Sequence, residues 1–227
     1  MRNEQIDEIR TYLSSKYPQF ELKEFLGEGN HGFVFAISEN KALKFTIDDG
    51  EIEVCRCLED HKFRYLCNIE KVGKRIELNV SWNNRSKEYT WIVLELLYKS
   101  PNQECVNQAL QDFRRSWSDL YKFSNFSWSD LWSIYRKREL SKITLCKQHC
   151  VNYIRSACEQ IAPWEELSKD QIDRRVSNAL KFFDFIENAY RELFKVCSFG
   201  EIDLNAGNFM LDENNNLKVI DMQKVNL

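Results

Sequence analysis

The sequence predicts an α+β fold in two lobes, with a β-rich N-terminal lobe and a helical C-terminal lobe. Short alternating apolar runs, separated by glycines and polar turns, fill residues 20–97, which is typical of antiparallel strands. Apolar residues at three-to-four spacing then dominate residues 98–199, which is typical of amphipathic helices. We therefore divide the chain into a leading helix (1–19), the β-rich lobe (20–97) and the helical lobe (98–227).

The elements follow in this order along the chain. Ile6, Ile9 and Leu13 recur at helical spacing and predict a first helix over residues 3–16. The β-rich lobe is predicted to contain three antiparallel strands between 20 and 46, a helix over 50–60, and strands around 75–82 and 89–96 with a polar turn at 83–86. The helical region ends in a hairpin predicted from two apolar runs, Phe209–Leu211 and Leu217–Ile220.

Bulk composition limits the classes of partner. The chain has 227 residues, 43% of them hydrophobic, and a formal net charge of −3, so it can bury a sizeable core and gives no reason to expect nucleic acid. Its N-terminus has no apolar signal-peptide core, and no apolar run reaches the ~18 residues of a membrane span. We expect a cytoplasmic protein without a membrane partner, in which the eight cysteines are reduced.

One stretch has the composition of a zinc site and contains Cys146, His149, Cys150 and Cys158. On a helix, their spacing puts all four on roughly one face. One straight face cannot surround an ion tetrahedrally, so the pattern favours a packed helix face and leaves zinc as the less favoured alternative.

A glycine-rich segment lies between the first two predicted strands. Gly27, Gly29, Gly32 and Val34 form the pattern G-x-G-x-x-G-x-V. A dinucleotide-binding fold needs a helix directly after the third glycine, whereas here a strand continues. The segment therefore belongs to a hairpin whose backbone N–H groups can approach phosphates, although such a match by itself is more often only a turn.

A lone lysine, Lys44, follows Ala42 and Leu43 in the predicted third strand. It is either a lysine on a solvated strand face or a cation that grips phosphate and is held by a carboxylate of the next helix. Glu51 is our choice of carboxylate, and Glu53 is the reserve. Because only seven residues separate Lys44 from Glu51, we expect a preformed ion pair rather than a switched one.

Three polar residues stand at a diagnostic spacing near the C-terminus. Asn208 follows Asp203 by five positions, and Asp221 follows Asn208 by thirteen, across the predicted hairpin. One carboxylate can orient a substrate hydroxyl, while an amide oxygen and a second carboxylate are the hard ligands that Mg²⁺ prefers. Each could be an ordinary turn residue, but their order after the glycine segment and Lys44 makes coincidence a poor explanation.

Together these motifs make the chain resemble the protein-kinase-like superfamily over about residues 20–227. The resemblance implies a bilobal protein-kinase-like fold that uses ATP and Mg²⁺. It also implies a role for each matching residue. Around the nucleotide it places Gly27, Gly29, Gly32, Val34 and Ala42, with Lys44 and Glu51 at the phosphates. The backbone of Glu95 to Leu97, beside the gatekeeper Leu94, would be the hinge that binds adenine, Asp203 would be the catalytic base, and Asn208 and Asp221 would be the metal ligands.

The chain also departs from the family pattern. Glu201-Ile202 stands where the family has His-Arg, and Asn205 replaces its catalytic-loop lysine. Because only six residues follow Asp221, we expect a reduced C-terminal lobe that lacks the activation segment and later helices, and activity that does not depend on phosphorylation there. The string Asp-Leu-Asn-x-Gly-Asn is similar to that of small bacterial effector kinases, which adds secretion into a host cell as an expectation.

The resemblance leaves three functions open. The leading one is a minimal serine/threonine protein kinase that acts on an acceptor protein. We expect it to be either constitutively competent or switched by an activating protein partner, and we favour the partner. The alternative is a small-molecule kinase of the aminoglycoside or choline type, although residues 98–199 carry 16 Lys plus Arg against 13 Asp plus Glu, which disfavours a cationic acceptor. The third is a pseudokinase binding module, which has no physical need of Lys44, Asp203, Asn208 and Asp221 together.

Overall fold

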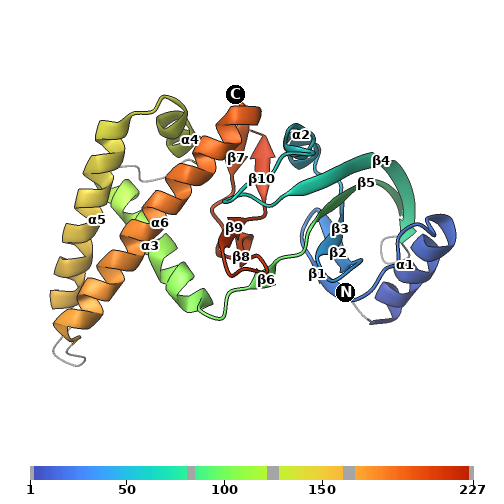
Figure 1. Ribbon diagram of the computed structural model, residues 1–227, viewed down its shortest axis with the longest axis horizontal. Coiled ribbons are helices and arrows are strands. Elements are labelled where there is room, and N and C mark those ends of the chain that lie inside the picture. Colours follow the sequence, from blue (N-terminus) through green and yellow to red (C-terminus); the bar gives the residue numbers. More distant parts are fainter. Residues whose placement is uncertain (1–2, 81–84, 122–127, 161–166, 225–227) are drawn as a thin grey trace.

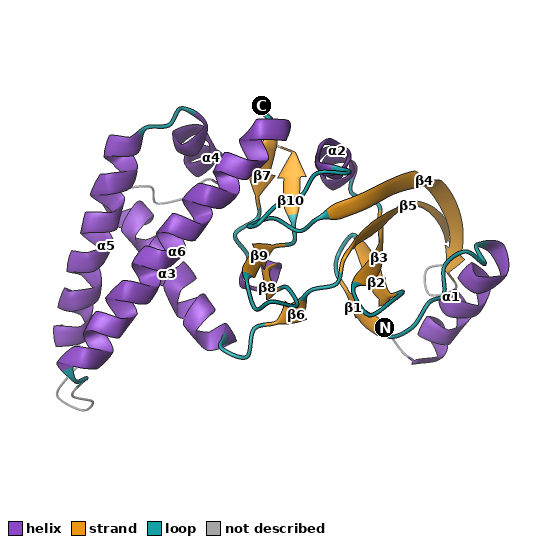
Figure 2. Ribbon diagram, in the orientation of Figure 1, coloured by secondary structure: helices purple, strands orange, loops and turns teal. Residues whose placement is uncertain are grey.

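The computed structural model describes residues 3–80, 85–121, 128–160 and 167–224 and shows an α+β protein in two parts (Figure 1). The longer strands gather in one part and the longest helices in the other, as Figure 2 shows. The predicted α+β fold class, with a β-rich and a helical part, is therefore confirmed.

The N-terminal part is built on a five-stranded antiparallel sheet in the order β1-β2-β3-β5-β4. Its strands are β1 (Phe25–Glu28), β2 (Gly32–Ala36), β3 (Lys41–Thr46), β4 (Ile69–Val80) and β5 (Arg85–Glu95). The last two are longer than predicted and form a curved ribbon (Figure 1). Residues 81–84, which include part of the predicted turn, lie outside the described residues.

The early half of β4 was missed because its pairing is irregular. The register against β5 shifts between Ile69 and Lys71 and again between Val72 and Arg75, so the strict alternation of a regular strand is broken. Gly73 lies in the second irregularity, where a Cβ atom would come within 1.8 Å of the Trp91 ring. Close packing of the indole on the strand backbone therefore requires glycine at this position.

The two faces of the sheet carry different residues. One face packs an aromatic core against α1 (Asn3–Lys16), the predicted leading helix, through Ile9 and Leu13. The core on this face includes Phe33, Phe35, Leu43, Phe45 and Tyr89. The alternation of strand residues puts Val34, Ala42 and Lys44 on the opposite face, and the register pairs Val34 with Lys44 and Ala42 with Leu94. Three residues predicted to surround the nucleotide thus share one face.

Helix α2 (Asp49–Leu58) follows β3 after a short connection. The carboxylate of Asp48 caps it by accepting a hydrogen bond from Glu51 N at 3.1 Å. Its buried face contains Ile52, Val54 and Leu58, while Glu51 in the first turn is also buried. The cap therefore fixes the start of the helix so that Glu51 faces the sheet rather than solvent.

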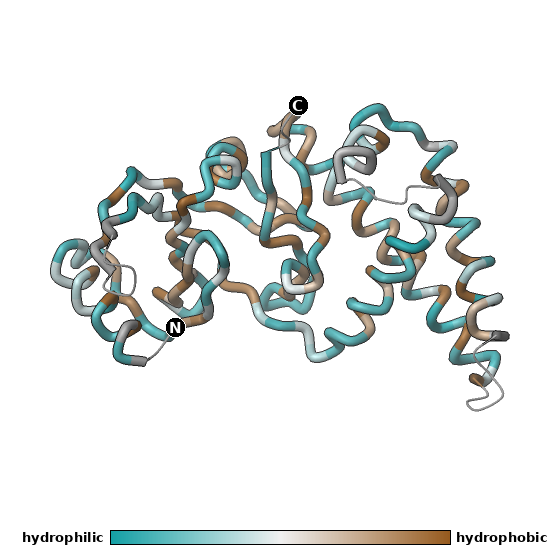
Figure 3. The backbone as a smooth tube through the Cα atoms, turned by 180° about the vertical axis from the view of Figure 1, so that it is seen from behind, coloured by the Kyte–Doolittle hydropathy of each residue, from teal (hydrophilic) through white to brown (hydrophobic). Residues whose placement is uncertain are grey.

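The C-terminal part contains four helices: α3 (Gln103–Tyr121), α4 (Trp128–Arg136), α5 (Leu140–Gln160) and α6 (Lys169–Val196). Their aromatic residues interlock, with Phe113 and Phe183 ring centroids 4.5 Å apart and Tyr135 stacked on Tyr190 at 4.8 Å. Hydrophobic and hydrophilic residues alternate along these helices, as Figure 3 shows. In the part of the chain that the structure describes, no helix is long and apolar enough to span a membrane.

The cysteine-rich stretch lies on α5 and packs into this helical core. Cys146, Cys150 and Cys158 are buried, and Cys150 Sγ donates to the Asp112 carbonyl of α3 at 3.7 Å. The helical spacing of the sequence is therefore realised as a core-facing stripe. Within the described ranges, no three His, Cys, Asp or Glu residues are grouped to hold a metal ion.

Two small sheets join the helical part to the N-terminal part. Strands β6 (Tyr98–Lys99), β8 (Phe209–Leu211) and β9 (Leu217–Val219) form one, and β7 (Gly200–Ile202) pairs with β10 (Met222–Lys224) in the other. The predicted β8–β9 hairpin is confirmed. Strand β9 also reaches the N-terminal part, since Val219 accepts from Cys67 N at 2.8 Å and donates to Tyr65 O at 2.9 Å.

Candidate active site

The glycine-rich segment closes the β1–β2 hairpin as a tight turn. Gly29 N donates to Gly32 O at 2.9 Å. A Cβ atom at Gly32 would lie 1.8 Å from Phe45 O, so only glycine lets β2 approach β3 at this point. Around Gly27 and Gly29, in contrast, no described atom lies within 4 Å of an added Cβ. The turn is therefore uncrowded at Gly27 and Gly29.

The predicted ion pair of the N-terminal part is present. Lys44 Nζ donates to Glu51 Oε1, and Thr46 Oγ1 donates to the other carboxylate oxygen at 2.9 Å. The side chains are 22% and 6% exposed, respectively, so the pair is largely shielded from water. The reserve choice, Glu53, was wrong as a partner, because it bonds Lys224 Nζ of β10 at 2.6 Å.

A third charge, Asp221, belongs to the same group. Burial opposes the positive charge of Lys44, but Glu51 and then Asp221 outweigh it and hold the pKa of Lys44 above its ordinary value. The lysine is therefore a permanent cation. Glu51 and Asp221, from α2 and from the segment before β10, both act on this one cation, and burial together with Asp221 raises the pKa of Glu51 against the effect of Lys44.

The residues that the spacing predicted to form a catalytic loop also lie close together. Asn208 Nδ2 donates to Asp203 Oδ2 at 2.8 Å and to Asp203 O at 3.2 Å. Asp203 N donates to Asp221 O at 3.2 Å, and Ile220 N donates to Asn208 O at 2.9 Å. These backbone bonds hold the loop after β7 against the segment after β9. Asp203, Asn208 and Asp221 are thereby neighbours although eighteen positions of sequence separate the first from the last.

Two residues of α3 hold this loop from behind, and neither was identified from the sequence. Arg114 Nη2 donates to Leu204 O, and Gln103 Nε2 donates to Ala206 O at 2.9 Å. The charge of Arg114 also opposes the rise in the pKa of Asp203 that burial and Asp221 cause. A polar residue on a helix gives no pattern that names a distant carbonyl as its partner, so no sequence signal was available.

Carboxyl groups near the loop titrate above their usual range. Burial, followed by the charge of Asp221, raises the pKa of Asp203, although the hydrogen bond from Asn208 opposes the shift. Burial and the nearby Asp203 raise the pKa of Glu201 to about 7. A raised pKa makes Asp203 a better proton acceptor in its ionised form, as general base catalysis at neutral pH requires.

The residues present fit a magnesium ion. Asn208 uses its amide nitrogen on Asp203, which leaves its amide oxygen available, and backbone bonds hold the segment that carries Asp221 beside Asp203 and Asn208. Mg²⁺ is commonly bound by one or two such oxygens together with substrate phosphates and water. Two protein ligands therefore suffice at this position.

The hinge between the two parts is already well ordered. Glu95 N donates to Asn68 O at 3.0 Å, and Leu96 N donates to Asn40 O at 2.9 Å. The Glu95 side chain accepts from Asn68 N and from Lys218 Nζ, at 2.7 Å and 2.6 Å. Leu97 is buried. The roles of Glu95 and Leu97 toward adenine remain predictions, and Lys218 is an addition that the structure makes.

Solved structures with a similar course of the chain are aminoglycoside phosphotransferases. The GDP complex of wild-type aminoglycoside 2'-phosphotransferase-IIIa has 11% sequence identity and a TM-score of 0.34, over 97% of this chain and 72% of that one. The streptomycin–ATP ternary complex of APH(2")-IIa has 16% identity and a TM-score of 0.30, over 99% of this chain and 72% of that one. No protein-family model and no curated protein matches the chain. At these TM-scores and identities, the similarity carries no inference about what this chain binds or does.

Proposed function

We propose that this protein is an ATP- and Mg²⁺-dependent phosphotransferase that acts on an alcohol hydroxyl. The observation that carries the proposal is the convergence of a buried lysine–glutamate pair, a catalytic-loop Asp–Asn pair and a further aspartate between the two parts of the chain. Asp221 acts electrostatically on both Lys44 and Asp203, which come from two other segments of the chain. Phosphoryl transfer needs little covalent chemistry from the protein and mostly needs such placed charges.

Each residue has a distinct task in the proposed reaction. Lys44, held by Glu51, pairs with phosphate oxygens beneath the glycine turn. Asp203 accepts the proton of the acceptor hydroxyl as its oxygen bonds to the γ-phosphorus and the bond to the ADP oxygen breaks. Asn208 and Asp221 hold Mg²⁺, which neutralises charge on the phosphates when bound.

We propose a serine or threonine hydroxyl of an acceptor protein as the first acceptor, following the sequence hypothesis. A small-molecule alcohol is the second candidate, and one observation favours it. Glu201 is partly buried near Asp203, and two neighbouring carboxyl groups at this loop would suit an acceptor bearing an amine. The requirement for an activating protein partner is part of the first proposal only.

Nucleotide binding is tested by thermal unfolding. A ligand that binds only the folded state raises the Tm by mass action, so millimolar Mg·ATP should stabilise the wild type. Asp221→Ala should lose most of the magnesium-dependent part of this shift. An unchanged wild-type Tm at millimolar Mg·ATP would refute the proposed function.

The acceptor class is tested by transfer from radiolabelled ATP into a cell lysate. A labelled protein band supports a protein acceptor, and a labelled small molecule supports the second candidate. Asp203→Ala is the control, because it retains the nucleotide site but loses the proton acceptor. The activating partner is tested by measuring transfer to a purified acceptor protein with and without added lysate. Transfer that requires lysate would support such a partner.

A further inference from the structure

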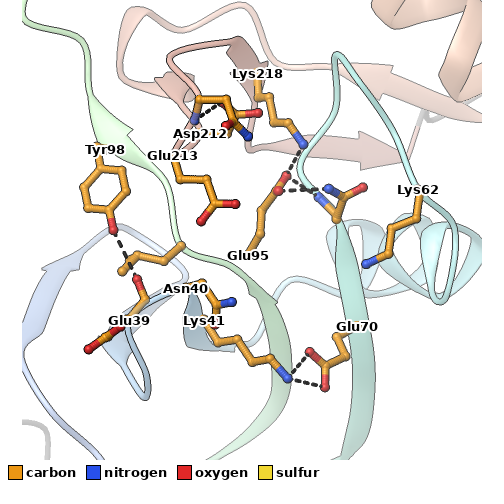
Figure 4. A pocket seen from close by; sticks show the side chains of 13 residues that line it. Glu39, Asn40, Lys41, Lys62, Glu70, Glu95, Tyr98, Asp212, Glu213 and Lys218 are labelled. Atoms are coloured by element: carbon orange, nitrogen blue, oxygen red, sulfur yellow. Dashed lines mark hydrogen bonds and ion pairs between the residues drawn. The ribbon is translucent and has the colours of Figure 1, made fainter.

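A polar cavity of about 340 Å³ lies on the outer side of the hinge, where the two parts of the chain meet (Figure 4). Residues of the β2–β3 turn, the start of β4, the hinge and the β8–β9 turn line it. Figure 4 shows Lys218 reaching from β9 toward Glu95 of the hinge. This contact joins residues 123 positions apart and is the feature from which the inference is drawn.

Lys218 is unusually buried for a lysine. Its side chain is 4% exposed, and its Nζ donates to Glu95 Oε1 at 2.6 Å and to Phe63 O at 3.1 Å. The neighbouring pair Lys41–Glu70 in the same cavity is different, since those side chains are 42% and 52% exposed. An exposed pair of that kind contributes little, whereas a buried one is costly to break.

The Glu95 carboxylate is held on more than one side. Asn68 N donates to Oε1 at 2.7 Å, and Asn68 Nδ2 donates to Oε2 at 2.8 Å. Asn68 itself is fixed, because its Oδ1 accepts from Phe63 N at 2.7 Å and its carbonyl accepts from Glu95 N. Glu95 therefore has a fixed side chain as well as a fixed backbone.

A buried ion pair is weak support for stability, because well-packed apolar residues often do as well in its place. Such a pair does, however, fix the relative position of the two chain segments that it joins. Lys218 stands three positions before Asp221. One short segment, 218–221, thus bonds the hinge at one end and carries a proposed metal ligand at the other.

We propose that Lys218 is a positioning residue for the nucleotide: it holds the Glu95 carboxylate and so fixes the backbone of Glu95 to Leu97 where adenine is to be bound. This inference rests on the proposed function. Lys218 touches neither nucleotide nor acceptor and acts through Glu95. Its loss should weaken nucleotide binding while the chemistry of the bound complex stays nearly the same.

Three variants separate positioning from simple structural support. Lys218→Met removes the charge and leaves the partly buried Glu95 carboxylate without its cation, so stability and nucleotide affinity should both fall. Lys218→Met/Glu95→Leu removes both charges, so stability should recover toward the wild type. Lys41→Met is the matched control, a lysine of the same cavity in an exposed pair.

The readouts are Tm, Kd and KM for Mg·ATP, kcat, and hydrogen exchange of the amides of residues 94–97. For the double variant we expect a recovered Tm, a Kd and KM raised about tenfold, as for one lost hydrogen bond to the nucleotide, and kcat within about twofold. Hinge amides should exchange faster, and Lys41→Met should match the wild type throughout.

Nucleotide affinity and hinge protection that recover together with Tm in the double variant would overturn the inference, because Lys218 would then be only structural. A fall in kcat without a change in KM would also overturn it. If the wild type bound no nucleotide, the proposed function would fail separately. Hydrogen exchange would still decide whether Lys218 fixes the hinge, with unchanged protection in the double variant as the contradicting result.

Discussion

Two buried ion pairs of similar exposure are surrounded by different charges. In the helical part, Arg175 of α6 binds Asp112 of α3 through two bonds, Nε to Oδ2 at 2.9 Å and Nη2 to Oδ1 at 2.7 Å. In the N-terminal part, Lys44 binds Glu51 through one oxygen. Arg175 and Lys44 are 21% and 22% exposed, and Asp112 and Glu51 are 0% and 6% exposed.

The two ion pairs differ in whether their charges are balanced within the pair. The Arg175–Asp112 pair is a bidentate fork between one cation and one anion, with Gln108 Nε2 as a further donor at 3.2 Å. Lys44 instead serves both Glu51 and Asp221. An ion pair that only supports the fold can have its two charges balanced by each other. A pair proposed to receive a ligand keeps a charge that is not balanced, and this lowers the stability of the folded protein.

Asp221→Asn should give the largest effect and separates function from stability at one residue. Phosphoryl transfer should fall about 10³-fold, because a proposed magnesium ligand is lost. Without Mg²⁺ the free energy of unfolding should stay the same or rise by about 1 kcal/mol, because repulsion with Glu51 and Asp203 is relieved. Urea unfolding and a transfer assay measure the two. A loss of several kcal/mol would make Asp221 a structural residue.

Asp112→Asn should do the opposite. It leaves the Arg175 guanidinium without its anion, and the free energy of unfolding should fall by about 3 kcal/mol. Transfer by the folded fraction should stay within about twofold. Asp184→Asn is the matched control, since Asp184 is 64% exposed in its pair with Lys147 and should change stability by less than about 1 kcal/mol. Equal losses of unfolding free energy in Asp112→Asn and Asp184→Asn would contradict a special structural role for the Arg175–Asp112 pair.

Glu51→Gln and Glu53→Gln test which carboxylate of α2 serves Lys44. The first should lower kcat/KM about 10²-fold, because Lys44 loses the anion that orients it. The second should leave kcat/KM within about twofold, because Glu53 pairs with Lys224 at the surface. Steady-state kinetics of both variants distinguishes the two carboxylates. Comparable losses of kcat/KM would mean that Glu53 also serves the site.

Glu201→Gln should give the smallest effect, visible as a pH dependence. Burial raises the pKa of Glu201 from 4.5 to about 7, so the stability that its neutral form contributes is full below about pH 4.5 and lost as the pH rises to about 7. Because the group is half-exposed, solvent screening limits the loss to about 1 kcal/mol. Urea unfolding at about pH 5 and about pH 8 should show a smaller difference for Glu201→Gln. The same difference in both proteins would contradict the assignment.

The elements were largely predictable because strict local patterns specify them. The alternation of Phe33, Phe35 and Phe45 on one face and Val34 and Lys44 on the other follows from strand geometry. The start of β4 did not follow, because bulges at its beginning break that alternation. Strands are predicted from apolar and polar residues that alternate with a period of two, so a strand in which bulges interrupt this alternation is missed.

The candidate site was predictable where a fixed spacing reflects one short loop, as for Asp203 and Asn208. The contacts of Arg114 and Gln103 were not, since they join a helix to a distant carbonyl. Lys218 is an intermediate case. It lies between Leu217 and Val219 as Lys44 lies between Leu43 and Phe45, a lone lysine in an apolar strand, and the same reasoning could have singled it out.

The two hydrophobic cores also differ in the length of chain that each requires. Every member of the core between the sheet and α1 comes from residues 9–93, whereas the larger core extends from Val54 to Met222. A ribosome makes the chain from its N-terminus, and units whose residues are complete can fold during synthesis. The N-terminal sheet can therefore pack while the catalytic loop has yet to be translated. Asp203 and Asp221 then close onto a lobe that is already folded.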